Sequence, residues 1–340
     1  MTDILNAIVL FMNFVGVPAL AYGSQLALGA LGVTLIFGVL RFAFFAHGDL
    51  MAFGTMVTIL ATWGLQAMGV SLGVLPTALL ALPFGAAAAV LAALSADKAV
   101  FAFYRRQRAK PVVFFIASVG VMFVLNGLVR IVIGPDDQRF ADGGRFLFKV
   151  GEFRDWSGLS EGLAIRTTQA LTVVAALIVM VALFRFLERT KMGKAMRAYS
   201  DNEDLALLSG VDPARVVRWT WVIAAVLATL AGVLYGLDKS FKPFTYFQLL
   251  LPIFAAAILG GIGSPKGAVV GAYIVAFSEV MVTYAYRKFA MYLGPQDWAP
   301  EGLLQLLSTE YKFSVSFLIL VAVAKTGRYL VVAALTLNWM

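Results

Sequence analysis

The 340-residue sequence contains no cysteine and a single histidine. Without cysteine the chain can form no disulfide, hold no thiolate-bound metal and use no cysteine nucleophile, and one histidine leaves little for a metal to bind. We therefore expect neither a metal site nor a cofactor. Charge is also scarce, because Asp, Glu, Lys and Arg make up only 14% of the residues. An intramembrane enzyme would need a nucleophile, an acid pair or a metal cluster, and this composition offers few residues for any of the three.

Apolar residues, in contrast, dominate the chain. They make up 61% of it, and the mean hydropathy is +0.87. One soluble core could not hide so much apolar surface, so lipid must be part of the solvent. The formal net charge of +8 could suggest nucleic-acid binding, but membrane proteins concentrate Lys and Arg in cytoplasmic loops for orientation alone. We expect a protein embedded in membrane lipid that binds no nucleic acid.

The apolar runs predict the fold class. A helix needs roughly 20 apolar residues to cross the hydrocarbon, and the chain divides into about ten such segments. This predicts an all-α, polytopic transmembrane helix bundle of about eight to ten spans, forming one domain over residues 1–340. Turn residues separate several spans, with Gly16-Val17-Pro18 and Gly23 dividing the first two. The expected spans are 4–20, 22–40, 49–68, 75–96, 112–133, 168–187, 217–236, 249–262, 267–286 and 314–331.

The density of Lys and Arg predicts how these spans are oriented. Residues 98–110 and 190–215 are rich in both, so the two loops should be cytoplasmic. Residues 134–167 carry basic and acidic residues in balance, which suits an outer loop. With ten spans, alternation then places both termini in the cytoplasm.

A polar stretch ending at Gly210 interrupts the apolar runs and predicts a short cytoplasmic helix. Ser200 followed by Glu203 fits a capping box, in which the hydroxyl accepts from the N–H of residue 203 and the carboxylate reaches back to residue 200. Asp204 complements the positive helix start, and Gly210 is placed to end the helix in a left-handed conformation. Leu205, Leu208 and the small Ala206 form an apolar patch on it. Such a helix either docks another protein or merely joins two spans, and periodicity leaves both open.

The residues after this helix carry a second start signal. Asp212 is placed to cap a helix with Pro213 in its first turn, and that helix leads directly into the span 217–236. A force applied to the short helix would therefore reach a transmembrane segment.

Three polar residues, His47, Asn126 and Glu279, are candidates for a solute path. Glu279 falls within an expected span and should face the protein interior or water, because an ionised carboxylate in lipid costs at least a few kcal/mol. A hydrogen bond to neighbouring helix backbone is its alternative role. His47 lies at a span boundary, where it either bonds locally while Asp49 caps the next helix or gates a ligand. Asn126 is the weaker candidate.

The glycines Gly261, Gly263 and Gly267 invite a nucleotide-loop interpretation. No strand precedes them, however, and the phosphate-binding pattern G-x-x-x-x-G-K-[ST] is absent from the sequence. We interpret them instead as a tight turn between two half-length helices, with Gly267 allowing close helix contact.

Several motifs resemble one group of ABC importer permeases. Asp204-Leu205-Ala206, three further residues and Gly210 are similar to the EAA-type cytoplasmic motif, an acid-x-Ala followed by Gly at fixed spacing. Other blocks resemble the permeases of branched-chain amino-acid transporters and their urea and amide relatives. These blocks are residues 45–49, 192–198, 231–236, 258–268 and 278–279.

The resemblance implies a permease subunit, not itself an enzyme, of an ATP-driven importer in the bacterial inner membrane. The expected solutes are branched-chain amino acids or related small amino acids, amides or urea. The expected partners are a second permease subunit, identical or related, two cytoplasmic ATP-binding subunits and an extracytoplasmic substrate-binding protein. The residues implied to couple to the ATPase are Ser200, Glu203, Asp204, Ala206 and Gly210.

An ion-coupled secondary transporter of small polar solutes is the alternative. Such a carrier would need paired ionisable groups at mid-membrane, and the sequence clearly offers only Glu279 there.

Overall fold

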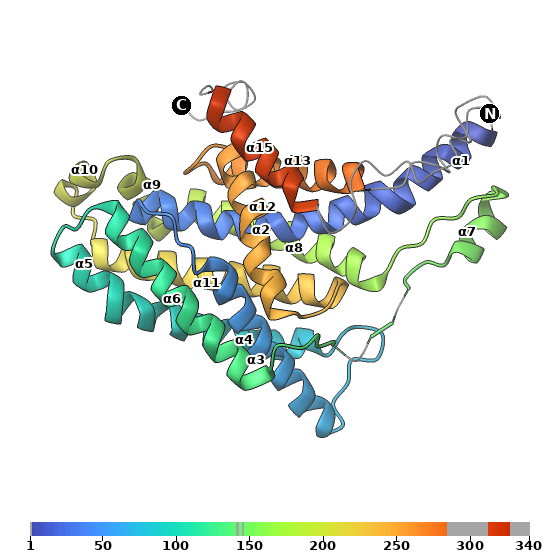
Figure 1. Cartoon of the computed structure of the whole chain (residues 1–340), viewed down its shortest axis with the longest axis horizontal. Coiled ribbons are helices and arrows are strands. Elements are labelled where there is room, and N and C mark those ends of the chain that lie inside the picture. The colour runs from blue at the N-terminus through green and yellow to red at the C-terminus, as the bar shows by residue number, and fades with distance from the viewer. Residues whose placement is uncertain (1, 141–142, 145, 284–311, 327–340) are drawn as a thin grey trace.

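The computed structural model describes residues 2–140, 143–144, 146–283 and 312–326. Within these ranges the regular elements are helices, accompanied by two isolated backbone bridges, Gln138–Phe241 and Phe148–Ile165. Seven helices are long and apolar enough to cross a membrane, and two shorter apolar helices lie beside them (Figure 1). The prediction of a polytopic helical membrane bundle is therefore confirmed.

The helices follow the chain in numerical order, and two π-helical stretches, η1 and η2, continue neighbouring α-helices without a break. Their bounds are α1 Thr2–Phe11, η1 Met12–Gly16, α2 Val17–Leu40, α3 His47–Ala67, α4 Ala78–Ala96, η2 Asp97–Phe101, α5 Ala102–Arg106, α6 Pro111–Ile133, α7 Val150–Ser157, α8 Thr167–Arg189, α9 Lys191–Asp201, α10 Glu203–Leu208, α11 Pro213–Asp238, α12 Pro243–Leu259, α13 Pro265–Thr283 and α15 Lys312–Thr326.

The first two expected spans are a single helix, so the predicted break at Gly16-Val17-Pro18 is wrong. Residues Ile4–Leu40 form 37 continuous helical residues. The wider π turn accommodates the proline: the N–H of Val17 bonds back to the carbonyl of Met12, five residues earlier, and Pro18 follows directly. Gly23 is not a turn either. A Cβ there would lie 2.5 Å from the Tyr273 ring, so its small size serves close packing.

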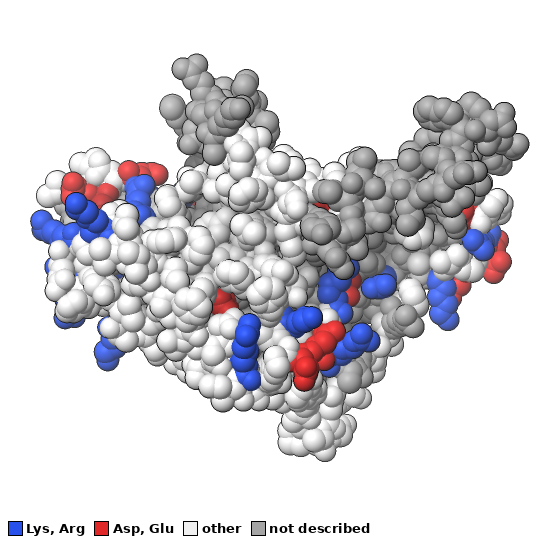
Figure 2. Space-filling model, in the orientation of Figure 1, with Lys and Arg blue, Asp and Glu red and all other residues white. Residues whose placement is uncertain are grey.

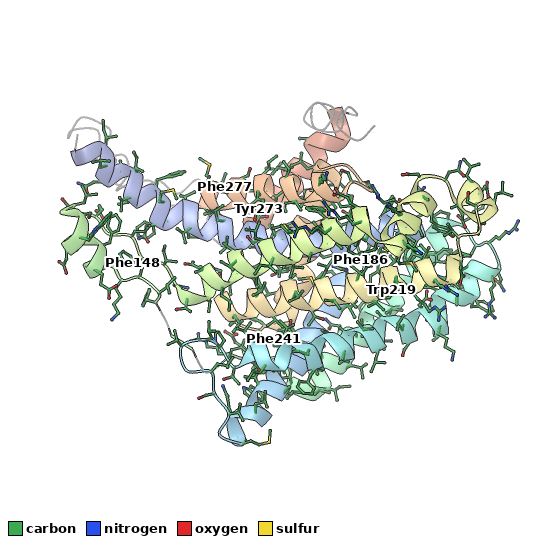
Figure 3. The ribbon with its side chains drawn as sticks, turned by 180° about the vertical axis from the view of Figure 1, so that it is seen from behind. Phe148, Phe186, Trp219, Phe241, Tyr273 and Phe277 are labelled. Atoms are coloured by element: carbon green, nitrogen blue, oxygen red, sulfur yellow. The ribbon has the colours of Figure 1, made fainter. Side chains whose placement is uncertain are left out.

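The central helix of the bundle is α2. It packs against α8, α11, α12 and α13, and almost all of its residues from Ala19 to Val39 are buried. Tyr273 of α13 points toward it (Figure 3), and its hydroxyl lies 2.9 Å from the Ser24 hydroxyl oxygen. Motion of α2 would consequently be transmitted to most of the other spans.

Two ends of the bundle differ in what they carry. One end holds α5, α9 and α10, whereas the N-terminus and α7 lie at the other (Figure 1). Charged groups lie at both ends, and a further group lies below the middle of the same face (Figure 2). Asn6 accepts from the N–H of Glu161 at 3.2 Å, and Asn13 accepts from the N–H of Ala164 at 3.0 Å.

The N-terminus therefore lies beside the loop 134–167. Since one continuous helix crosses only once, the predictions that the N-terminus is cytoplasmic and that this loop is outside cannot both hold. The carboxyl terminus lies outside the described residues, as do the ends of the expected spans 267–286 and 314–331.

The turn between α12 and α13 is tight, and the two helices are nearly of full length, with 17 and 19 residues. Gly261 and Gly263 both have φ of +91°, a conformation that side chains disfavour. Gly267 faces the carbonyl oxygen of Gly260, which a Cβ at 267 would approach to 1.8 Å. The expected turn and close contact are thus present, but the helices they join are not half-length.

Candidate functional site

The short helix predicted around residues 200–210 is α10, and it begins later than expected. Asn202, with φ −150° and ψ 107°, separates it from α9 and caps it by accepting from the N–H of Leu205 at 3.0 Å. Ser200 lies in the last turn of α9, and its hydroxyl donates to the carbonyl of Gly38 on α2 at 3.0 Å. The predicted capping box is therefore wrong: Ser200 joins α9 to α2 instead.

Glu203 also has a partner other than the predicted one. Its Oε1 accepts from the hydroxyl of Tyr199 at 2.5 Å, which ties the start of α10 to α9. Burial raises the pKa of the Tyr199 hydroxyl, and the adjacent Glu203 raises it further, so this tyrosine stays protonated as a donor.

The two faces of α10 differ in exposure. Ala206 is buried, whereas Leu205 is 61% and Leu208 85% exposed. Ala206 consequently belongs to the face turned toward the bundle and does not share an outward patch with the leucines. Asp204 is exposed beside them. The outer face of α10 thus offers apolar side chains and an acid with no cover from the described part of the chain.

The end of α10 is closed by hydrogen bonds around Gly210. This residue has φ of +80°, its N–H donates to the carbonyl of Leu207, and the N–H of Val211 donates to that of Ala206, both at 3.0 Å. These two bonds form a Schellman motif, which favours glycine at this position. Asp212 then caps α11 by accepting from the N–H of Ala214 at 2.9 Å.

Two of the three candidate path residues concern the start of α3: His47 is its first residue, and Asn126 contacts its first turn. Asn126 of α6 donates to the carboxylate of Asp49 at 2.7 Å, and both Asp49 and His47 are fully buried. Asp49 is therefore not the cap of α3; it lies in its first turn, where the helix dipole favours an anion. The His47 ring packs edge-on to Phe44 and fills the space that Gly32 leaves on α2.

Glu279 belongs to a different cluster. It is 1% exposed on α13, as expected for an intramembrane acid, and Ser316 of α15 donates to its Oε1. Tyr22 of α2 and Tyr235 of α11 interact with it electrostatically. The carboxylate thus lies where side chains of four helices meet: α2, α11, α13 and α15.

A third buried acid, Asp97, escaped the sequence reasoning. It lies in η2, and its carboxylate accepts from both guanidinium nitrogens of Arg105, at 2.9 and 3.0 Å. The indole of Trp221 on α11 donates to the same carboxylate at 2.8 Å. The sequence signal was the acid itself, eight residues before Arg105 in a helix that runs from Ala78 to Arg106.

No group of three or more His, Asp or Glu side chains that could hold a metal occurs within the described ranges. The geometry offers buried polar groups between spans and an outward-facing short helix, which suit transport and docking.

Comparison with known proteins gives three informative relatives. The chain matches the family model described as "Branched-chain amino acid transport system / permease component" over residues 17–339. It is 30% identical over 302 residues to the high-affinity branched-chain amino acid transport system permease protein LivH of Escherichia coli, covering 88% of this chain and 89% of LivH. BraD of Pseudomonas aeruginosa is 29% identical over 266 residues, covering 77% and 83%. LivM of Escherichia coli is 27% identical over 152 residues, covering 42% and 36%.

Proposed function

Because the chain belongs to the family of branched-chain amino acid transport permeases, we propose that it is the membrane-spanning subunit of an ATP-driven importer. Its solutes are branched-chain amino acids or related small amino acids, amides or urea. The observation that carries this proposal is the match over residues 17–339, which spans almost the whole bundle. The relatives do not favour the ion-coupled alternative.

A separate ATPase subunit would bind at α10. The exposed Leu205 and Leu208 support this, because apolar side chains on a short helix beyond the membrane gain from being covered by a partner. Asp204 would contact the ATPase at the rim of the interface, while Ala206 and Gly210 determine how the helix packs and where it ends. Glu203 joins α10 to α9, and Ser200 joins α9 to α2, so that movement of the docked ATPase reaches the spans.

The orientation follows from this role. Residues 190–215 form the cytoplasmic coupling loop of a single permease domain, and the loop 134–167 faces outward together with the N-terminus. The complete importer contains a second permease subunit, a copy or a relative like LivM, and a substrate-binding protein on the outside of a bacterial inner membrane. His47, Asn126 and Glu279 line or gate the solute path, a role that their positions between helices support.

The test replaces the exposed leucines of α10. Leu205→Arg with Leu208→Arg should release the ATPase from the complex purified in mild detergent and abolish ATP-dependent uptake. Leu147→Arg is the matched control, since this leucine is 60% exposed at the other end of the bundle. If the α10 variant keeps normal ATPase binding and uptake, the helix is only a connector and the coupling proposal is wrong.

A further inference from the structure

A cavity of about 770 Å³ lies beside α9 at the α10 end of the bundle. Its walls come from the last two turns of α2, from α9, from Leu187 at the end of α8, and from residues 262–265 at the start of α13. Binding cavities for small molecules typically fall between roughly 300 and 1,000 Å³. The space is thus large enough for a small solute together with water.

Charges of both signs line this cavity. Lys194, Arg197 and Asp201 are lining residues of α9. Their spacing of three and four residues places them along one face of that helix. Arg41 at the end of α2 adds a third cation to the lining. A ligand here would therefore meet an excess of positive charge. The single carboxylate, that of Asp201, lies one helical turn from Arg197.

One part of the wall is apolar. Leu35 and Val39 of α2 are four residues apart, so they share a face of that helix, and both line the cavity together with Leu187. All three are buried, so each presents only a small part of its surface to the cavity. A ligand that carried only charge would leave this wall covered by water, whereas an aliphatic side chain would cover it favourably.

Arg41 is held in place at this cavity. Its φ of 60° is left-handed, a backbone conformation that is unfavourable for a residue other than glycine. The conformation persists because its N–H donates to the carbonyl of Phe37 and its guanidinium donates to the carbonyl of Ser200 on α9. Strain of this kind is concentrated at ligand sites and switches.

We propose that this cavity binds an apolar α-amino acid as its zwitterion. The carboxylate contacts Arg197 and Lys194, the ammonium contacts Asp201, and the aliphatic side chain lies on Leu35, Val39 and Leu187. Naming this class of ligand rests on the proposed function of the chain. The site lies at the end where an imported solute is released, so it would be filled as the internal concentration rises.

A bound amino acid would join α2 to α9. Because α9 leads through Asn202 into α10, the ligand would oppose relative movement of the coupling helix and the central span. Accumulated solute would in this way slow its own import.

The experiment measures equilibrium binding of radiolabelled L-isoleucine to the full chain in nanodiscs, without ATPase or ATP. Two analogues separate the charges: 3-methylpentanoate lacks the ammonium, and 2-methylbutylamine lacks the carboxylate. Each should compete at least tenfold more weakly than isoleucine, since each leaves one charged contact unmade. Lys194→Gln, Arg197→Gln and Asp201→Asn should each weaken isoleucine binding by about tenfold.

Arg218→Gln is the matched control, because Arg218 is exposed at the same end and does not line the cavity. It should bind isoleucine like the unaltered chain. Gel filtration and circular dichroism identify any variant that fails to fold, and the exposed Lys194 and Asp201 are the safer positions in that respect.

Unchanged isoleucine binding in folded Lys194→Gln and Asp201→Asn would overturn the proposal. A second result would also overturn it: the chain binds no isoleucine but retains anionic phospholipid, and Arg197→Gln loses that phospholipid. The cavity would then hold a lipid headgroup. Either result leaves ATPase binding and uptake untouched, so failure of this site is distinguishable from failure of the proposed function.

Discussion

The indole N–H of Trp221 donates to the Oδ1 of Asp97 at 2.8 Å, and the same oxygen lies 2.9 Å from a guanidinium nitrogen of Arg105. Arg105 also interacts electrostatically with Tyr199, whose hydroxyl bonds to Glu203. Polar contacts therefore run from the transmembrane helix α11 to the start of α10.

These contacts lead to a prediction for Asp97. Asp97→Ala should lower the free energy of unfolding by about 2 kcal/mol, because it leaves the buried indole N–H without an acceptor. Asp97→Asn should cost less, since the amide oxygen can still accept from Trp221. Thermal denaturation in detergent measures both. Equal losses for the two variants would mean that the ion pair, and not the indole bond, carries the effect.

A second prediction concerns the contact between α12 and α13. Gly267→Ala should destabilise the chain by about 3 kcal/mol, because its Cβ would collide with the carbonyl of Gly260 and the backbones must separate. Gly120→Ala, inside α6 with nothing within 4 Å of the added carbon, should be neutral or slightly stabilising. Melting temperatures of the two purified variants provide the comparison, and similar values would refute the close contact.

Glu279 gives a third prediction. Glu279→Gln should retain a substantial share of ATP-dependent uptake, because an amide still accepts a hydrogen bond from Ser316. Glu279→Leu should lose most uptake or fail to assemble, since the buried hydroxyl then loses its acceptor. Ser278→Ala is the neighbouring control, as its hydroxyl only bonds the preceding turn at Ile274. Uptake that stops with a protonophore while ATP is held constant would favour an ion-coupled carrier instead.

The fourth prediction tests orientation. Single cysteines in this cysteine-free chain can be labelled on whole cells with an impermeant thiol reagent. Leu5→Cys and Gly151→Cys should both react, because the N-terminus lies on the same side as the loop 134–167. Gln107→Cys and Ser209→Cys should react only after the cells are opened. Labelling of Leu5→Cys and Gly151→Cys on opposite sides would contradict the fold.

Local signals predicted local structure well. The role of Gly210 as the end of α10 and of Asp212 as the cap of α11 could be read from the sequence, because their partners lie within four residues. The chemistry of a cap depends on the residue type and on a short stretch of backbone.

Contacts between distant residues could not be read in the same way. Ser200 fits a capping pattern, yet its hydroxyl bonds Gly38, which is 162 positions away, and Asn202 takes the cap. Gly23 looked like a turn because nothing in the sequence indicates that the Tyr273 ring needs its space. Asp97 went unnoticed since its indole partner lies 124 positions along the chain.

The first helix includes 37 continuous residues from Ile4 to Leu40. At 1.5 Å per residue it extends roughly 55 Å, well beyond the hydrocarbon thickness of about 30 Å. Its first turns therefore hold the segment around α7 in place through Asn6 and Asn13. Because the helix is so long, tilting it by roughly 10° about its Leu40 end would move its other end through about 10 Å. A small change near Gly38 on α2 would thus become a large displacement of the loop 134–167.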